Sequence, residues 1–208
     1  MLAMNATTKL QPGIAGLLFA LLLWQGCQGL AFADDEAPNP FYVTANGPMY
    51  AKSVPAEHYG TEGKTYVYVA DTDTDNFQPE VNTDRLLYTF DWYSPFRLYL
   101  GFYGSMIRLG PWPRGSQASE DDLAIALYHE DKLLASYSTL DLAGSPDAVE
   151  RSVSHYVIIR EIRGYRWLPG NKGLFELETT NGELLSFDVA TGAMTRTPIP
   201  ATDSAGNN

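Results

Sequence analysis

The sequence predicts an all-β protein: a single antiparallel β-sandwich or partly closed β-barrel with at most one or two short helices. Runs of β-branched and aromatic residues recur along the chain. Glycine, asparagine and proline separate these runs at the short spacing of an antiparallel meander. The pattern is clearest in residues 152–195, where a β fold is therefore assigned most directly.

Residues 1–33 are expected to be a cleavable signal peptide. Lys9 gives the start a positive charge, residues 14–24 are apolar or glycine, and Ala31-Phe32-Ala33 has the small-x-small pattern of a cleavage site. Two alternatives stay open: a lipoprotein anchored through Cys27, and an uncleaved anchor, because the apolar stretch approaches the ~20 residues that span a bilayer. We expect an exported protein, periplasmic or secreted, with no membrane span after signal removal.

The cysteine count limits the chemistry of the mature protein. Cys27 is the only cysteine, so cleavage after Ala33 leaves none. Disulfides, thiolate zinc sites and cysteine nucleophiles are then excluded, and stability must come from the packed core.

The chain is acidic, with a formal net charge of −11 at pH 7. Nucleic acids carry negative phosphates, so we expect no nucleic-acid partner. A basic surface on a partner protein fits this charge better. The alternative is that the charge only keeps an exported protein soluble.

The sequence after the signal peptide divides into three parts. Residues 34–64 are expected to be a leader and loop-rich segment, with loop from residue 46 to residue 63. Residues 65–197 form the β domain, and residues 198–208 form a disordered tail. The strands expected in the first half of the β domain cover residues 65–70, 85–91, 96–102 and 105–110. A loop with two prolines, which cannot donate to a β-ladder, follows at residues 110–115.

Residues 122–137 are compatible with a helix or a hairpin. Ser119 and Asp122 resemble a capping box, but apolar residues alternate and a polar segment at residues 129–132 separates two apolar arms. We favour the hairpin. A short helix is expected at residues 148–151, because Ser145-Pro146-Asp147 resembles a helix start.

The last third of the chain predicts a buried strand and a hairpin. Residues 156–162 are rich in β-branched side chains and are expected to be a strand buried on both faces. Residues 174–180 and 183–189 flank Asn181-Gly182, a pair typical of a type I′ turn. A final strand is expected at residues 193–197.

Asp71, Asp73 and Asp75 are spaced two apart, and carboxylates in this pattern can converge on Ca²⁺. An EF-hand loop requires Gly and Glu where this chain has Asn76 and Asn82. The alternative is a polar hairpin tip. Apart from this candidate calcium site, we predict no cofactor.

Ser154 and His155 suggest a serine nucleophile and its base. On a strand, however, adjacent side chains point to opposite faces. We therefore expect His155 to point away from Ser154 and to be a half-buried, hydrogen-bonded residue rather than a catalytic one.

Arg160, Arg163 and Arg166 are spaced by three. On a regular strand this spacing scatters them between the two faces. We expect them to form ion pairs with the acidic surface.

The candidate ligand-binding residues are Trp92, Tyr93, Trp112, His155 and Trp167. With Tyr99 and Tyr103, these aromatic residues suit a platform for a sugar or a peptide; the alternative is that they fill the core and its rims. Strand carboxylates at Asp91, Glu161, Glu176 and Glu178 leave glycoside cleavage open as well.

The sequence favours a non-enzymatic function, and we predict no catalytic residue. The preferred hypothesis is an exported β domain that binds a partner protein or an envelope component, in the manner of an immunity or inhibitor protein. One alternative is a small exported hydrolase that uses two carboxylates on carbohydrate or peptidoglycan. The other is a structural envelope protein.

Overall fold

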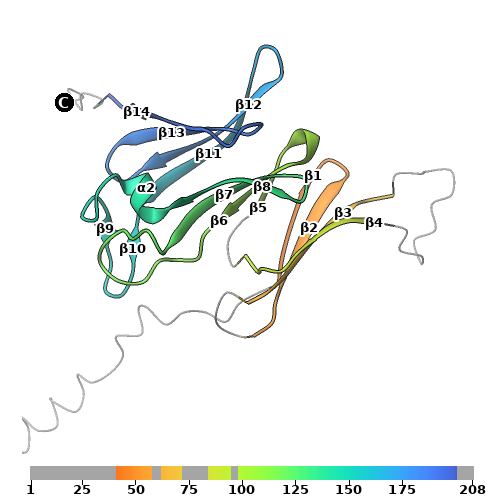
Figure 1. Ribbon diagram of the computed structural model, residues 1–208, viewed down its shortest axis with the longest axis horizontal. Helices are drawn as coiled ribbons and strands as arrows, with labels where there is room; N and C mark the ends of the chain where they lie inside the picture. The colour runs from red at the N-terminus through yellow and green to blue at the C-terminus, as the bar shows by residue number, and fades with distance from the viewer. Residues whose placement is uncertain (1–40, 58–61, 72–83, 95–97, 201–208) are drawn as a thin grey trace, which may run out of the picture. The chain divides into compact units, whose positions relative to one another are not determined.

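The computed structural model describes residues 41–57, 62–71, 84–94 and 98–200, and it confirms an all-β fold (Figure 1). These residues form four antiparallel sheets and one short α-helix, and the sheets stay open rather than closing into a barrel. No helix in these ranges is long and apolar enough to cross a membrane.

Three of the sheets are four-stranded meanders that follow one another along the chain. The first sheet contains β1 (Tyr42–Asn46), β2 (Met49–Pro55), β3 (Gly63–Val69) and β4 (Arg85–Phe90). The second contains β5 (Leu98–Leu100), β6 (Ser105–Leu109), β7 (Leu123–His129) and β8 (Lys132–Ser138). The third contains β11 (Ile159–Leu168), β12 (Lys172–Thr179), β13 (Glu183–Asp188) and β14 (Met194–Pro198). The remaining elements are η1 (Phe102–Gly104), α2 (Thr139–Ala143), β9 (Glu150–Arg151) and β10 (Tyr156–Val157).

The central strands of the second sheet, β6 and β7, are covered on both faces. On one face Ile125 and Leu127 belong to the same buried cluster as Phe175 of the third sheet. On the other face Tyr128 packs with Phe90 of the first sheet. β7 is therefore buried on both sides, which explains its nearly unbroken apolar sequence and confirms the hairpin with β8.

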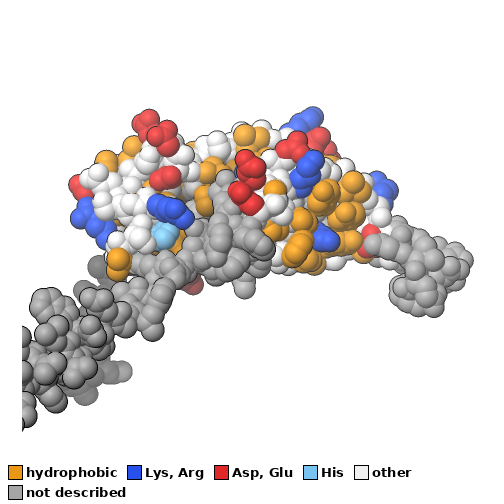
Figure 2. Space-filling model, turned by 90° about the horizontal axis from the view of Figure 1, so that it is seen from below, with side chains coloured by type: hydrophobic (Ala, Val, Ile, Leu, Met, Phe, Trp, Pro, Cys, Tyr) orange, Lys and Arg blue, Asp and Glu red, His pale blue; other side chains and the backbone are white. Residues whose placement is uncertain are grey.

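The two outward faces of this stack differ in chemistry. On the third sheet ion pairs cover the surface, among them Arg166 with Glu176 at 2.9 Å. On the first sheet Tyr50 and Tyr68 stack with ring centroids 5.0 Å apart, and Lys52 is exposed beside them on the same face. Figure 2 shows hydrophobic side chains gathered on one part of the surface with basic side chains among them.

The loop expected between residues 46 and 63 was partly wrong, because β2 occupies Met49–Pro55. Ala51 and Ser53 are fully buried there, and the Ser53 and Thr65 hydroxyl oxygens lie 2.8 Å apart. Small residues suggested a loop, but their small size lets β2 pack closely inside the first sheet.

The short helix expected at residues 148–151 was also wrong. The segment beginning at Ser145 makes a single turn in which the Ala148 N–H donates to the Ser145 carbonyl, and residues 150–151 are strand β9. The helix lies earlier, at α2, where Ser138 and Asp141 form a reciprocal capping box.

The hairpin of β12 and β13 was predicted correctly, but its turn is of another type. Gly182 adopts a φ of +83°, whereas Asn181 is not among the residues with positive φ. The Gly182 N–H donates to the Thr179 carbonyl, so the turn ends in a left-handed glycine instead of having two left-handed centres.

Burial of β7 on both faces predicts that adjacent positions are equally sensitive to truncation. We expect Leu127→Ala and Tyr128→Ala each to lower the free energy of unfolding by about 2–5 kcal/mol. The control Leu133→Ala, at an exposed site on β8, should change it by about 0.5 kcal/mol or less. Urea unfolding measures all three, and a neutral effect at either Leu127 or Tyr128 would contradict the stacked arrangement.

Candidate functional site

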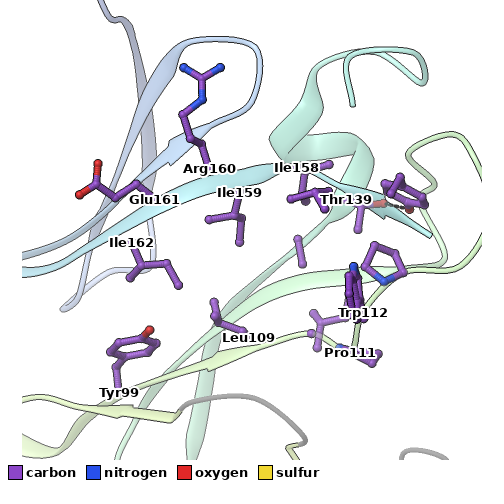
Figure 3. Close-up of a pocket in the computed structure, with 16 residues that line it drawn as sticks. Tyr99, Leu109, Pro111, Trp112, Thr139, Ile158, Ile159, Arg160, Glu161 and Ile162 are labelled. Atoms are coloured by element: carbon purple, nitrogen blue, oxygen red, sulfur yellow. Dashed lines mark hydrogen bonds between the residues drawn. The ribbon is translucent and has the colours of Figure 1, made fainter. Parts of the chain in front are cut away.

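A cleft of about 440 Å³ lies where the chain leaves β6 and where β11 begins (Figure 3). Its wall on the β11 side is formed by Ile158, Ile159 and Ile162. Leu109 at the end of β6 and Trp112 in the following loop lie opposite them. The cleft is therefore mainly apolar, which is typical of ligand-binding cavities.

The first of two β-bulges in β11 directs the isoleucines into this cleft. Ile159 pairs with Thr179 and Ile162 pairs with Leu177, so three steps along β11 match two steps along β12. A regular strand would place residues three apart on opposite faces. The first bulge instead keeps Ile159 and Ile162 on the inner face, and Arg160 points away from the cleft (Figure 3).

The same bulges correct the expectation for the arginines. A second register shift follows Ile162, so Arg160, Arg163 and Arg166 all lie on the exposed side of β11 instead of being scattered. Their ion pairing was predicted correctly, since Arg163 pairs with Glu178 and Arg166 pairs with Glu176.

β11 is also an edge strand. The third sheet has the order β11-β12-β13-β14, so β12 is the only strand that pairs with β11 in the part of the chain described. The other side of β11 has no strand partner in the described ranges. An edge beside an apolar cleft is suited to binding an extended peptide.

The loop after β6 is fixed at both of its ends. The Gly110 N–H donates to the Ala124 carbonyl, and a Cβ at Gly110 would lie 1.6 Å from the Leu123 carbonyl oxygen. At the other end, the Tyr156 N–H donates to the Pro113 carbonyl. These contacts hold the intervening proline-rich segment in place and leave Trp112 53% exposed at the cleft.

His155 packs against Trp112, with ring centroids 5.0 Å apart. His155 is only 8% exposed, and its Nδ1 lies 2.8 Å from the Ser154 hydroxyl. The expectation that His155 points away from Ser154 was therefore wrong, because residue 154 lies in a bend where strand alternation does not apply. His155 is thus a buried, hydrogen-bonded residue that packs against Trp112.

Polar groups at one end of the cleft are bonded to one another. The Tyr156 hydroxyl donates to the Asp122 carboxylate at 2.7 Å and contacts the Thr139 hydroxyl at 2.8 Å. Thr139 in turn donates to the Ser119 carbonyl. Burial, together with the nearby Asp122, raises the pKa of Tyr156 to about 12.

The five predicted ligand-binding residues do not form one site. Trp112 and His155 lie together at the cleft, as described above. Tyr93 is fully buried. Trp92 packs between the first and second sheets, where the guanidinium carbon of Arg108 lies 4.3 Å from its ring centroid. Trp167 lies in a separate recess.

The candidate calcium ligands are only partly described. Asp73 and Asp75 lie outside the described residues, while the Asp71 N–H donates to the Asp84 carboxylate at 3.1 Å. Within the described ranges, no group of three or more His, Cys, Asp or Glu side chains is placed to hold a metal ion. Calcium binding at Asp71, Asp73 and Asp75 stays a prediction.

The isoleucine wall was the part of the site that the sequence did not reveal. Residues 156–162 were expected to fill a strand buried on both faces, whereas Ile159 and Ile162 are partly exposed and line a cavity. Ile159 and Ile162 are three residues apart, and two apolar residues at this spacing share a face of a strand only if a bulge lies between them. Strand pairing is needed to show which residue is the extra one.

Comparisons with known proteins give no relationship for this chain: a scan of family models, a search of curated proteins and a search of solved structures each found no match. The fold and the cleft thus define the chain only as an all-β protein with a ligand-sized apolar cavity.

Tyr156 provides a test of the polar end of the cleft. We expect Tyr156→Phe to lower the free energy of unfolding by about 1–3 kcal/mol, because Asp122 loses a buried donor. Folding raises the Tyr156 pKa from 10.0 to about 12, so this contribution is complete below pH 10 and is lost as the pH rises toward 12. Urea unfolding between pH 7 and pH 11.5 should show a weaker alkaline loss in the variant, and an equal loss would contradict this assignment.

Proposed function

We propose that this chain is a non-enzymatic, exported binding domain whose cleft holds apolar side chains of a partner protein. The observation that carries the proposal is the apolar cleft itself, walled by Ile159 and Ile162 and flanked by an exposed Trp112. Exposed tryptophan beside a preformed apolar cavity is typical of the residues that dominate binding energy at interfaces.

The open edge of β11 supports an extended conformation for the bound segment. A partner strand that pairs with the open side of β11 would extend the third sheet and direct alternate side chains toward the cleft. Main-chain hydrogen bonds would then supply affinity, and the isoleucine wall would select apolar side chains. A periplasmic or secreted partner fits the signal peptide expected at residues 1–33.

The alternative of a carboxylate-based hydrolase has less support. Glycoside cleavage uses two carboxyl groups on either side of the scissile bond. Glu161 is the only carboxylate among the described residues that line the cleft, and its side chain points away from the cavity (Figure 3). A purely structural protein, the other alternative, has no need of such a cavity.

The acidic charge of the chain supports a basic partner surface around the apolar contact. A net charge of −11 attracts such a surface over a distance, and salt weakens this attraction. Contacts in the apolar cleft respond little to salt. The two contributions are therefore separable by experiment.

A photo-crosslinking residue at position 112 tests the proposed cleft contact. We expect tagged protein carrying p-benzoylphenylalanine in place of Trp112 to crosslink one partner from native envelope extract. The same crosslinking residue in place of Leu133 should not crosslink this partner. Leu133 is the matched control, because it is 54% exposed and Trp112 is 53% exposed. Mass spectrometry identifies the crosslinked protein.

The variant Ile162→Ser should weaken retention of that partner by about tenfold or more, because it places a hydroxyl in the apolar wall. Retention that persists at moderate salt supports the cleft as the main contact. A partner that crosslinks equally from both positions, or is retained equally by Ile162→Ser, would contradict the proposal.

A further inference from the structure

A second recess of about 220 Å³ lies at the other ends of β6, β7 and β11. Ser105 begins β6, His129 ends β7 and Trp167 lies near the end of β11, and all three line it. The first cleft instead adjoins the end of β6 and the starts of β7 and β11. The two cavities therefore share strands but no lining residue.

Three aromatic rings form one side of this recess. Trp167 contacts Phe102 with ring centroids 5.8 Å apart and Tyr103 with centroids 6.0 Å apart, and both contacts are edge-to-face. Phe102 is 56% exposed and Tyr103 is 72% exposed. Large apolar area thus remains open to a ligand beside a fixed indole.

A glycine fixes the position of Trp167. A Cβ at Gly173 would lie 2.8 Å from Cζ3 of the Trp167 ring and 2.6 Å from Cγ2 of Val189. Because no side chain is present there, the indole lies directly against the β12 backbone. Its orientation is therefore set before any ligand binds, which lowers the entropic cost of binding.

Tyr103 is held in an unusual backbone conformation. Its φ and ψ are +57° and +33°, a left-handed region that bulky side chains rarely adopt, and Gly104 follows with a φ of +79°. The turn presents the tyrosine ring to solvent beside Trp167 instead of burying it. Backbone strain of this kind is often found at binding sites.

Charged groups of both signs also line the recess. Asp188 accepts hydrogen bonds from the N–H groups of Ala190 and Thr191, and the ammonium of Lys172 lies 3.7 Å from its carboxylate. Although partial burial opposes ionisation, these donors hold the pKa of Asp188 below its usual value. The recess thus offers a fixed anionic acceptor and a cationic donor side by side.

We propose that this recess binds a saccharide ring. The apolar C–H face of a sugar packs on exposed aromatic rings, and its hydroxyls both donate and accept hydrogen bonds, which matches Asp188 and Lys172. An organic cation would also contact the aromatic rings, where Asp188 attracts it and Lys172 repels it, so choline serves as the competing probe in the test below. The site is independent of the protein-binding cleft, because none of its lining residues belongs to that cleft.

Isothermal titration of the full-length chain with triacetylchitotriose, cellotriose and maltotriose tests the proposal, with choline chloride as the probe for organic cations. We expect at least one trisaccharide to bind. Tyr103→Gly should weaken that binding by about tenfold or more, because it removes an exposed ring that contacts the sugar. Its melting temperature should not fall, since glycine favours the left-handed backbone at this position.

Trp112→Ala, in the other cleft, is the matched control and should bind the trisaccharide as the parent chain does. Trp167→Ala should abolish sugar binding. If the Trp167→Ala variant does not fold, the Tyr103→Gly variant still tests the proposal. Binding of none of the three sugars, binding of choline alone, or sugar binding unchanged by Tyr103→Gly would each overturn the proposal.

Discussion

Burial of β6 and β7, the central strands of the second sheet, on both faces is the constraint on which the rest of the structure depends. Adjacent residues of β7, such as Leu127 and Tyr128, belong to two different cores. Strands covered in this way cannot present a ligand site on their faces, because the neighbouring sheets occupy those faces. Open space is left at the ends of its strands, and both cavities adjoin β6 and β7 there.

The bulges of β11 determine what the larger cavity contains. A regular strand would turn either Ile159 or Ile162 outward and would bring an arginine inward. Each extra residue instead shifts the alternation, so the inner face is apolar while Arg163 and Arg166 reach carboxylates on the outer face. The two bulges together therefore give the cleft its apolar wall and place ion pairs on the outer face of the third sheet.

The sequence predicted those turns whose conformation depends on residues adjacent in the chain. The hairpin turn at Gly182 and the turn that Asp188 begins depend on nearby residues, so both were predictable. The position of β2 depends on pairing with β1 and β3, and the contact of His155 with Trp112 depends on a loop far away in the sequence. Such non-local contacts and the position of a bulge cannot be read from the local pattern of a single sequence.

The polar groups with shifted pKa values at the two cavities, Tyr156 and Asp188, do not titrate near neutral pH. A general acid or base works best when its pKa lies near the ambient pH. Tyr156 moves in the opposite direction, to about 12, and the pKa of Asp188 falls below its usual value. Both groups are already hydrogen-bonded within the protein, Tyr156 to Asp122 and Asp188 to backbone N–H groups. Their charge states therefore stay constant around neutral pH, as the proposed binding roles of the two cavities require.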